Sequence, residues 1–150
     1  MSNSVVTRPE NISLFPIPDT TVNLYGKKNP FSAKVLDKYR ISGSSSPNYC
    51  WHVVLDISGS QMAQNYRSGQ SIGIIPSGRF NNAEFNQAHN QVRNGKLAEK
   101  IRLYSISSSC WGDNWCGNTI SICVKREIGE DTNSGQLVMG SASNLSLIHI

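Results

Sequence analysis

The residues best suited to chemistry lie together in the stretch 100–108, KIRLYSISS. If this stretch is a β-strand, alternate side chains leave opposite faces, so Arg102 and Tyr104 point the same way. We expect Ser105 to turn back beside them, which gathers a cation, an aromatic ring and a hydroxyl within about 7 Å of strand. Such a set could neutralise a phosphate, stack on a planar ring and hydrogen-bond a heteroatom. Because Arg-x-Tyr-Ser also occurs by chance in many strands, its meaning depends on the surrounding elements.

Length and composition are those of an ordinary globular chain. With 150 residues, of which 38% are hydrophobic and 16% charged, the sequence has room for one domain with a real core. The net charge of +4 is too modest to indicate a polyanion binder, although it would favour an acidic protein partner. No apolar run approaches the ~20 residues that span a membrane.

Other sequence features bear on the compartment. The segment Met1–Glu10 has no apolar core after a basic head, so we predict no signal peptide. The cysteines at positions 50, 110, 116 and 123 form no CxxC pair, and Cys110 and Cys116 have no nearby histidine. We therefore expect unmodified thiols, no metal site and a reducing cytoplasm. His52 and His89 are isolated, and we predict a structural role for both.

The elements that position the central stretch are predicted to be other short strands. Besides the strand that begins at residue 100, these are residues 31–41, 50–57, 71–75, 119–125 and 137–139, with segments rich in Gly, Pro, Ser and Asn between them. Residues 81–99 fit a poor amphipathic helix or a solvated loop equally well, and residues 127–134 are predicted to form a charged loop. Five or six short strands favour an all-β barrel or sandwich. No strand–helix–strand alternation, GxGxxG or P-loop motif occurs, so we expect no doubly wound dinucleotide-binding fold.

Several motifs fall in a familiar order. Residues 66–76, YRSGQSIGIIP, are similar to the EGQSIGVIP strand in the flavin domain of plant-type ferredoxin–NADP reductases, and RLYS at 102–105 matches that family's RxYS signature. The CVKR at 123–126 matches a further strand of the family, and GSASN at 140–144 stands where the family has GVCSN. Residues 23–25 and 28–30 resemble the segment leading into the first strand. The resemblance covers roughly residues 22–144 and depends on four motifs in order.

The resemblance implies a six-stranded antiparallel Greek-key barrel that binds FAD. In this interpretation residues 1–21 form an N-terminal arm and residues 22–144 form the FAD-binding domain. The family's NADP domain has no counterpart in the sequence, so we expect the 150-residue chain alone to be inactive. Residues 145–150, LSLIHI, do not resemble the family's continuation, and we interpret them as a non-native tail. A natural apolar C-terminus that packs on the barrel is the alternative.

The resemblance also implies roles for individual residues. Arg102 would bind the FAD pyrophosphate, Tyr104 would stack on the isoalloxazine, and Ser105 would act near flavin N5 as the catalytic residue. Ser105 and Lys125 would also meet the nicotinamide nucleotide of NADP(H). The remaining residues that would contact FAD are Leu103, Cys123, Val124, Ser141, Ala142 and Ser143. The last three would form a small-residue turn that holds phosphate, because small side chains let the backbone approach an anion closely.

The sequence departs from the family pattern at the adenine end of the cofactor. The family often places a tyrosine that stacks on adenine a few residues after CVKR, but residues 127–130, EIGE, offer none. The segment 81–99 is also longer than the family's usual turn. The contacts of the adenine therefore stay open at this stage.

The function implied by the resemblance is FAD-dependent electron transfer between NADP(H) and a one-electron carrier, an acidic ferredoxin or flavodoxin. The same module also serves as the reductase component of oxygenases, including benzoyl-CoA epoxidase-like proteins, and this alternative stays open. Other classes are a non-catalytic β-barrel interaction module and a barrel that stacks single-stranded nucleic acid on Tyr104 and Trp51. Because the aromatic residues are sparse and the charge is low, we expect no nucleic-acid partner.

Overall fold

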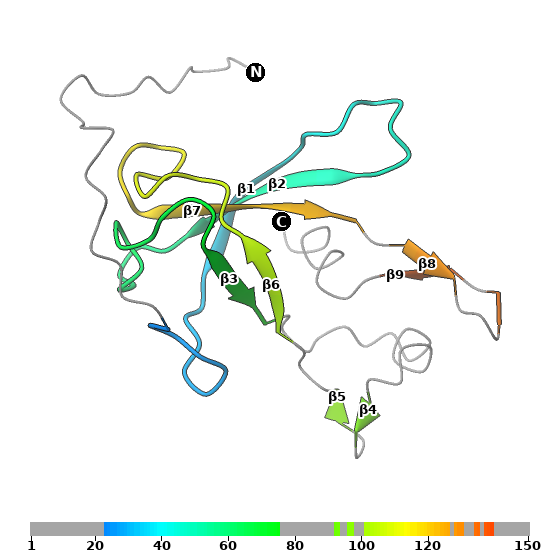
Figure 1. The fold of residues 1–150 in the computed structure, drawn as a ribbon, viewed down its shortest axis with the longest axis horizontal. Coiled ribbons are helices and arrows are strands. Elements are labelled where there is room, and N and C mark those ends of the chain that lie inside the picture. Colours follow the sequence, from blue (N-terminus) through cyan, green and yellow to red (C-terminus); the bar gives the residue numbers. More distant parts are fainter. Residues whose placement is uncertain are drawn as a thin grey trace.

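The computed structural model describes residues 23–75, 101–126, 128–130 and 134–135, and the backbone of residues 92–93, 96–97 and 137–139. Every regular element in this part of the chain is a β-strand (Figure 1). No helix there has the length and apolar character needed to cross a membrane. The strands are β1 Lys34–Arg40, β2 Cys50–Asp56, β3 Ser71–Ile74, β4 Val92–Arg93, β5 Lys96–Leu97, β6 Arg102–Ser105, β7 Thr119–Lys125, β8 Ile128–Glu130 and β9 Leu137–Met139.

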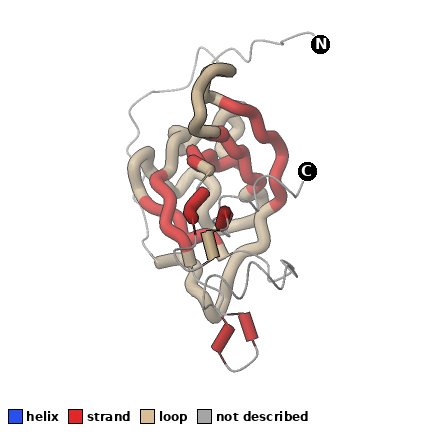
Figure 2. Tube along the Cα trace, turned by 90° about the vertical axis from the view of Figure 1, so that its right-hand side faces the viewer, coloured by secondary structure: helices blue, strands red, loops and turns tan. Residues whose placement is uncertain are grey.

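Five of these strands run side by side in the order β3–β6–β7–β2–β1. The pairs β3–β6, β7–β2 and β2–β1 are antiparallel ladders, and an isolated antiparallel bridge between Ile106 and Ile122 joins β6 to β7. The strands β3, β6 and β7 lie in a row, and β2, which precedes them in the chain, lies on the far side of β7. This arrangement is that of a Greek key. Within the described residues β1 and β3 remain open edges, and Figure 2 shows the strands curving around the interior. The pairs β4–β5 and β8–β9 form separate hairpins.

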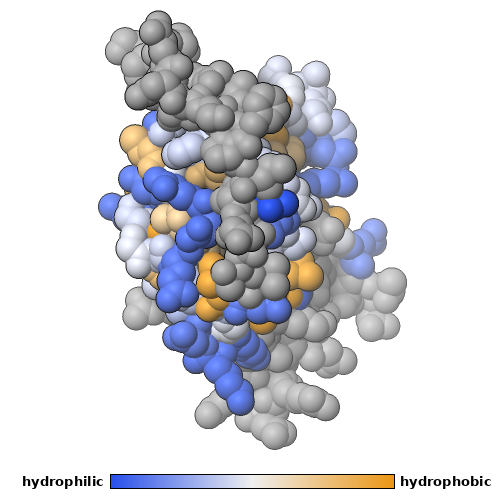
Figure 3. Space-filling model, turned by 60° about the vertical axis from the view of Figure 1, so that its left-hand side comes forward, coloured by the Kyte–Doolittle hydropathy of each residue, from blue (hydrophilic) through white to orange (hydrophobic). Residues whose placement is uncertain are grey.

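The register between the long strands places one apolar row from each on the concave side. Val53 lies opposite Ile122 and Leu55 opposite Ile120, so these four side chains leave the same face of the sheet. Together with Ile57, Tyr66, Ile106 and Val124 they form the buried core. On the face that Figure 3 shows, the described surface is largely hydrophilic, with apolar residues scattered among the polar ones.

The predicted all-β Greek-key fold class is confirmed, because the elements are antiparallel strands in that order, but the described strands do not close into a barrel. The predicted strands at 31–41, 50–57, 71–75, 119–125 and 137–139 coincide with β1, β2, β3, β7 and β9 to within a few residues. Two predictions are wrong. The expected loop at 127–134 contains β8, whose backbone pairs with β9. The segment 81–99 was expected to be either a poor helix or a solvated loop, but its described residues form the short hairpin β4–β5, in which Val92 lies opposite Leu97.

Candidate functional site

The central strand β6 presents alternate side chains to the core and to the outside. Arg102 and Tyr104 are half-buried and Ile106 is buried, whereas Leu103 is 73% exposed. Tyr104 packs against the buried core. The prediction that Arg102 and Tyr104 share a face is therefore confirmed, and that face is the concave one.

Ser105 lies on the opposite face. It is exposed and pairs with Ser71 as the last residue of a regular ladder in which Ile72 faces Tyr104. Because no bulge interrupts this ladder, nothing turns the hydroxyl back toward its neighbours. The expectation that Ser105 lies beside Arg102 and Tyr104 is therefore wrong.

The neighbouring strand β7 shows the same alternation at its end. Val124 is 2% exposed and belongs to the core, whereas Cys123 and Lys125 are exposed on the outer face. Its partner strand contributes Trp51 opposite Val124. Of the three predicted residues on β7, only the side chain of Val124 therefore lies on the same face as Tyr104.

The facing edges of β6 and β7 separate beyond a single bridge. After the Ile106–Ile122 bridge, neither strand has a described strand partner along that edge (Figure 1). If the register of the bridge is extended, Tyr104 falls level with Val124 and Arg102 level with Arg126. Backbone N–H and C=O groups of such edges need partners. A planar molecule placed between the two edges could meet these groups and touch side chains from both faces of each strand, including Tyr104 on one face and Ser105 on the other.

A buried tyrosine holds the closed end of this opening together. The Tyr66 hydroxyl lies 2.9 Å from Ser108 Oγ and donates to the carbonyl oxygen of Thr119 at 2.8 Å. Ser108 Oγ in turn accepts from the backbone N–H of Ser121 at 2.9 Å. Burial raises the pKa of Tyr66 to about 12, because the phenolate would lose its hydration. The phenol thus ties the segment after β6 to β7.

A second polar cluster lies on the outer face of β2 and β7. His52 Nε2 lies 3.3 Å from Asp113 Oδ1, and Ser121 Oγ donates to the other oxygen of that carboxylate. The ring of Tyr39 stacks on His52, with centroids 4.9 Å apart and an interplanar angle of 28°. The pKa of Tyr39 is raised, first by burial and then by the negative charge of Asp113. No group of metal-ligating side chains occurs among the described residues.

Sequence reasoning gave no sign of this cluster. His52 was predicted to be structural, which fits its place on the sheet, but Asp113 carried no prediction. Its loop folds back across the strands only in three dimensions, so no spacing in the sequence connects the two residues. The predicted phosphate-holding residues Ser141, Ala142 and Ser143 lie outside the described residues, as do both the N-terminal arm and the tail.

Comparisons with known proteins agree with the motif analysis. The chain is 36% identical over 140 residues to the ferredoxin–NADP reductase leaf isozyme 2 of Oryza sativa subsp. indica, which covers 93% of this chain and 34% of the relative. It is 38% identical over 123 residues to the ferredoxin–NADP reductase leaf isozyme 1 of Arabidopsis thaliana, which covers 82% of this chain and 29% of the relative. A ferredoxin–NADP reductase from Picosynechococcus is 37% identical over 122 residues, which cover 81% of this chain and 27% of the relative.

A solved structure shares the fold. The ferredoxin–NADP+ reductase of Plasmodium falciparum with 2'P-AMP superposes with a TM-score of 0.56 at 27% identity, covering 87% of this chain and 37% of that one. No family model matches the chain. The chain spans about a third of the length of its relatives, and the predicted resemblance is confirmed over that part.

Proposed function

We propose that this chain forms the FAD-binding domain of a ferredoxin–NADP reductase, with that domain spanning residues 22–144. The chain matches about a third of the length of such enzymes. The full-length protein would pass electrons between NADP(H) and ferredoxin through FAD. The observation that carries the proposal is a half-buried arginine and tyrosine on the concave face of β6, beside a strand edge that opens toward β7.

The residues at this opening suit an FAD molecule. Tyr104 offers a flat aromatic surface that is fixed by the core, and such surfaces stack on planar rings. Arg102 has no hydrogen-bond or ion-pair partner among the described residues, so its guanidinium is available to an anion. An arginine fork matches phosphate oxygens. When bound, FAD would supply the redox chemistry, since no amino-acid side chain exchanges both hydride and single electrons.

The protein's own part is to bind and orient the cofactor. Arg102 would hold the pyrophosphate of FAD, and Tyr104 would stack on the face of the isoalloxazine. The backbone edges of β6 and β7 would contact the edge of the isoalloxazine. Ser105, whose exposed hydroxyl leaves the other face of β6, would contact the ring edge near the hydride-accepting atom. The further contacts in this proposal are Leu103, Cys123, Val124 and Lys125, with the turn at Ser141, Ala142 and Ser143.

The co-substrate and partner follow from the same relationship. The Plasmodium falciparum reductase was solved with 2'P-AMP, which supports NADP(H) as co-substrate, with Ser105 and Lys125 as its contacts on this domain. The names of the relatives support ferredoxin as electron carrier. The net charge of +4 would also favour binding of an acidic flavodoxin. Four free thiols support a reducing compartment, which we propose to be the cytoplasm.

The cofactor tests the proposal. The full-length protein should purify with a flavin that, after denaturation and chromatography, elutes as FAD. Reconstitution of the apoprotein should favour FAD over FMN, because FMN lacks the pyrophosphate that Arg102 would hold. Recovery of FMN, or of no flavin together with no binding of added FAD, would contradict the assignment.

A further inference from the structure

The concave face of the sheet continues past the apolar core as a row of aromatic rings with cations stacked on them. Lys38 Nζ lies 4.5 Å from the centroid of the Trp51 ring, and the guanidinium carbon of Arg40 lies 4.1 Å from that of Tyr49. The guanidinium carbon of Arg126 lies 5.7 Å from the same Tyr49 ring. These five residues come from three separate segments of the sequence, and the β1–β2–β7 ladder brings them together.

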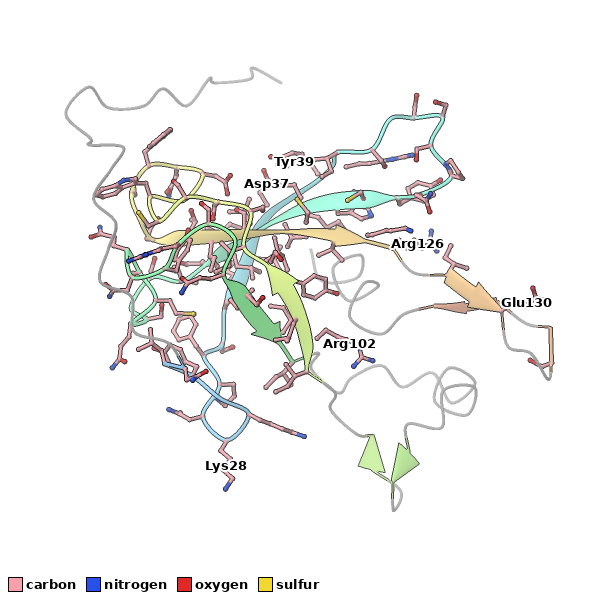
Figure 4. All side chains as sticks on the ribbon, viewed as in Figure 1. Lys28, Asp37, Tyr39, Arg102, Arg126 and Glu130 are labelled. Carbon is pink, nitrogen blue, oxygen red and sulfur yellow. The ribbon has the colours of Figure 1, made fainter. Side chains whose placement is uncertain are left out.

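The strand register explains why these side chains share one face. Arg40 lies opposite Trp51, which lies opposite the core residue Val124. Two residues further on, the Arg126 N–H donates to the Tyr49 carbonyl at 2.7 Å, so Tyr49 and Arg126 form the next row on the concave side. Figure 4 shows Arg126 just past the end of β7 and Arg102 at the start of β6.

The cluster has the chemistry of a site for an aromatic anion. Tyr49 remains 36% exposed although two guanidinium groups approach it. Lys38 and Arg40 have no carboxylate partner among the described residues, so their positive charge is not neutralised there. Aromatic rings with neighbouring arginines stack purine bases, and cations beside them bind phosphate.

The cluster also lies where a dinucleotide would extend. On the concave side Trp51 and Val124 lie opposite each other, and Tyr49 and Arg126 lie one pair further along, past the end of β7. The edge of β7 that faces β6 opens beyond the Ile106–Ile122 bridge. A molecule held at Tyr104 and Arg102 that also reaches across this opening to the end of β7 would meet Arg126 and Tyr49 there. The strand β8 that follows provides no aromatic residue, because its sequence is Ile-Gly-Glu.

We propose that Tyr49, with Arg126 and Arg40, holds the ADP half of FAD, so that a residue at the start of β2 supplies the stacking surface for adenine. This inference depends on the proposed function, because it concerns the same cofactor. Tyr49 supplies a ring for the base, and Arg126 supplies charge for the adjacent phosphates. Arg40 also donates to the carbonyl oxygens of Gly43 and Ser46 at 2.7 and 3.1 Å, which fixes the hairpin that carries Tyr49.

The test compares two tyrosines in the full-length apoprotein. Tyr49→Ala should weaken FAD binding about ten- to hundredfold, since loss of one stacking ring has an effect of this size. FMN binding should stay within about twofold of wild type, because FMN has no ADP half. Tyr49→Trp should retain FAD affinity. The matched control is Tyr39→Ala, which removes a comparably exposed ring from the outer face and should leave both affinities unchanged.

The outcomes separate this inference from the proposed function. If wild type does not bind FAD, the proposed function itself fails. If wild type binds FAD and Tyr49→Ala binds it equally well, the Tyr49 site is wrong and the proposed function stands. An equal loss of FAD and FMN affinity would show a general structural effect and would also overturn the site. A raised KM for NADPH with unchanged FAD affinity would assign the cluster to the other dinucleotide, and this result too would overturn the inference.

Discussion

Arg102 and Ser105 lie at opposite ends of β6 and on opposite faces, so their substitutions should have different effects. Arg102→Ala in the full-length protein should weaken FAD binding about tenfold to hundredfold, because a hydrogen bond to a charged group contributes about 1.5–3 kcal/mol. Ser105→Ala should retain flavin but reduce it about a hundredfold more slowly, the size of effect seen when one well-placed donor is lost. Flavin content and single-turnover reduction by NADPH measure the two quantities.

Ser71→Ala is the matched control for Ser105→Ala. Ser71 lies directly opposite on β3, is also exposed, and lies on the side of β6 away from β7. Its loss should change neither flavin content nor reduction rate. Equal slowing by Ser71→Ala and Ser105→Ala would show that the hydroxyl acts through the ladder rather than on the cofactor, and retention of flavin by Arg102→Ala would remove Arg102 from the pyrophosphate site.

Tyr66 should make stability depend on alkaline pH. Its pKa is raised to about 12 by burial, whereas a tyrosine in the unfolded chain titrates near 10. Between about pH 10 and 12 the folded state retains the Tyr66 proton, whereas the unfolded state loses it. The contribution of this proton to the free energy of unfolding is therefore complete below about pH 10 and is lost as the pH rises toward 12. Tyr66→Phe should remove this dependence of the free energy of unfolding on pH between about 10 and 12. At neutral pH it should lower the free energy of unfolding by about 1–3 kcal/mol. Denaturant unfolding measured between pH 7 and 12 tests both effects, and identical slopes in the two proteins would contradict the assignment.

At the level of elements, the loop between Ile106 and β7 requires a glycine at residue 112. Gly112 has φ +69, and a Cβ added there would lie 2.8 Å from the carbonyl oxygen of Thr119, closer than such contacts occur. Gly59 has a similar φ of +74 but open space around it. Gly59→Ala should therefore cost about 1–2 kcal/mol, from backbone conformation alone. Gly112→Ala should cost about 1–3 kcal/mol more, because the neighbouring strand must move. Denaturation midpoints of the two variants test this, and equal midpoints would show that the loop has room to adjust.

At the level of the whole molecule, the Greek-key order creates the opening at which we propose that the cofactor binds. The chain leaves β2, crosses to β3, and returns through β6 to β7. Among the described residues β6 and β7 share a single bridge, between Ile106 and Ile122. Twisted sheets separate at such junctions because adjacent strands rotate relative to each other. Both predicted binding strands, RLYS and CVK, border this separation. The position of the proposed site is thus a consequence of topology, and its side chains would determine which ligand fits.

Local sequence determined the strands and the orientation of most of their side chains. Alternation over 101–106 placed Arg102 with Tyr104, and the β-branched run at 119–125 predicted β7 to the residue, because side-chain period and strand propensity are properties of adjacent residues. The order of the motifs was enough to predict the similarity to ferredoxin–NADP reductases that the comparisons confirm.

Only the tertiary structure decided which residues from different strands meet. It placed Ser105 on the face opposite Tyr104, paired His52 with Asp113, and stacked Arg40 and Arg126 on Tyr49. It also showed that Ile128–Glu130 is a strand, because β9 supplies the hydrogen-bonding partner that its own composition does not predict. Pairing across the sheet depends on register between segments far apart in the chain, and no local pattern carries that information.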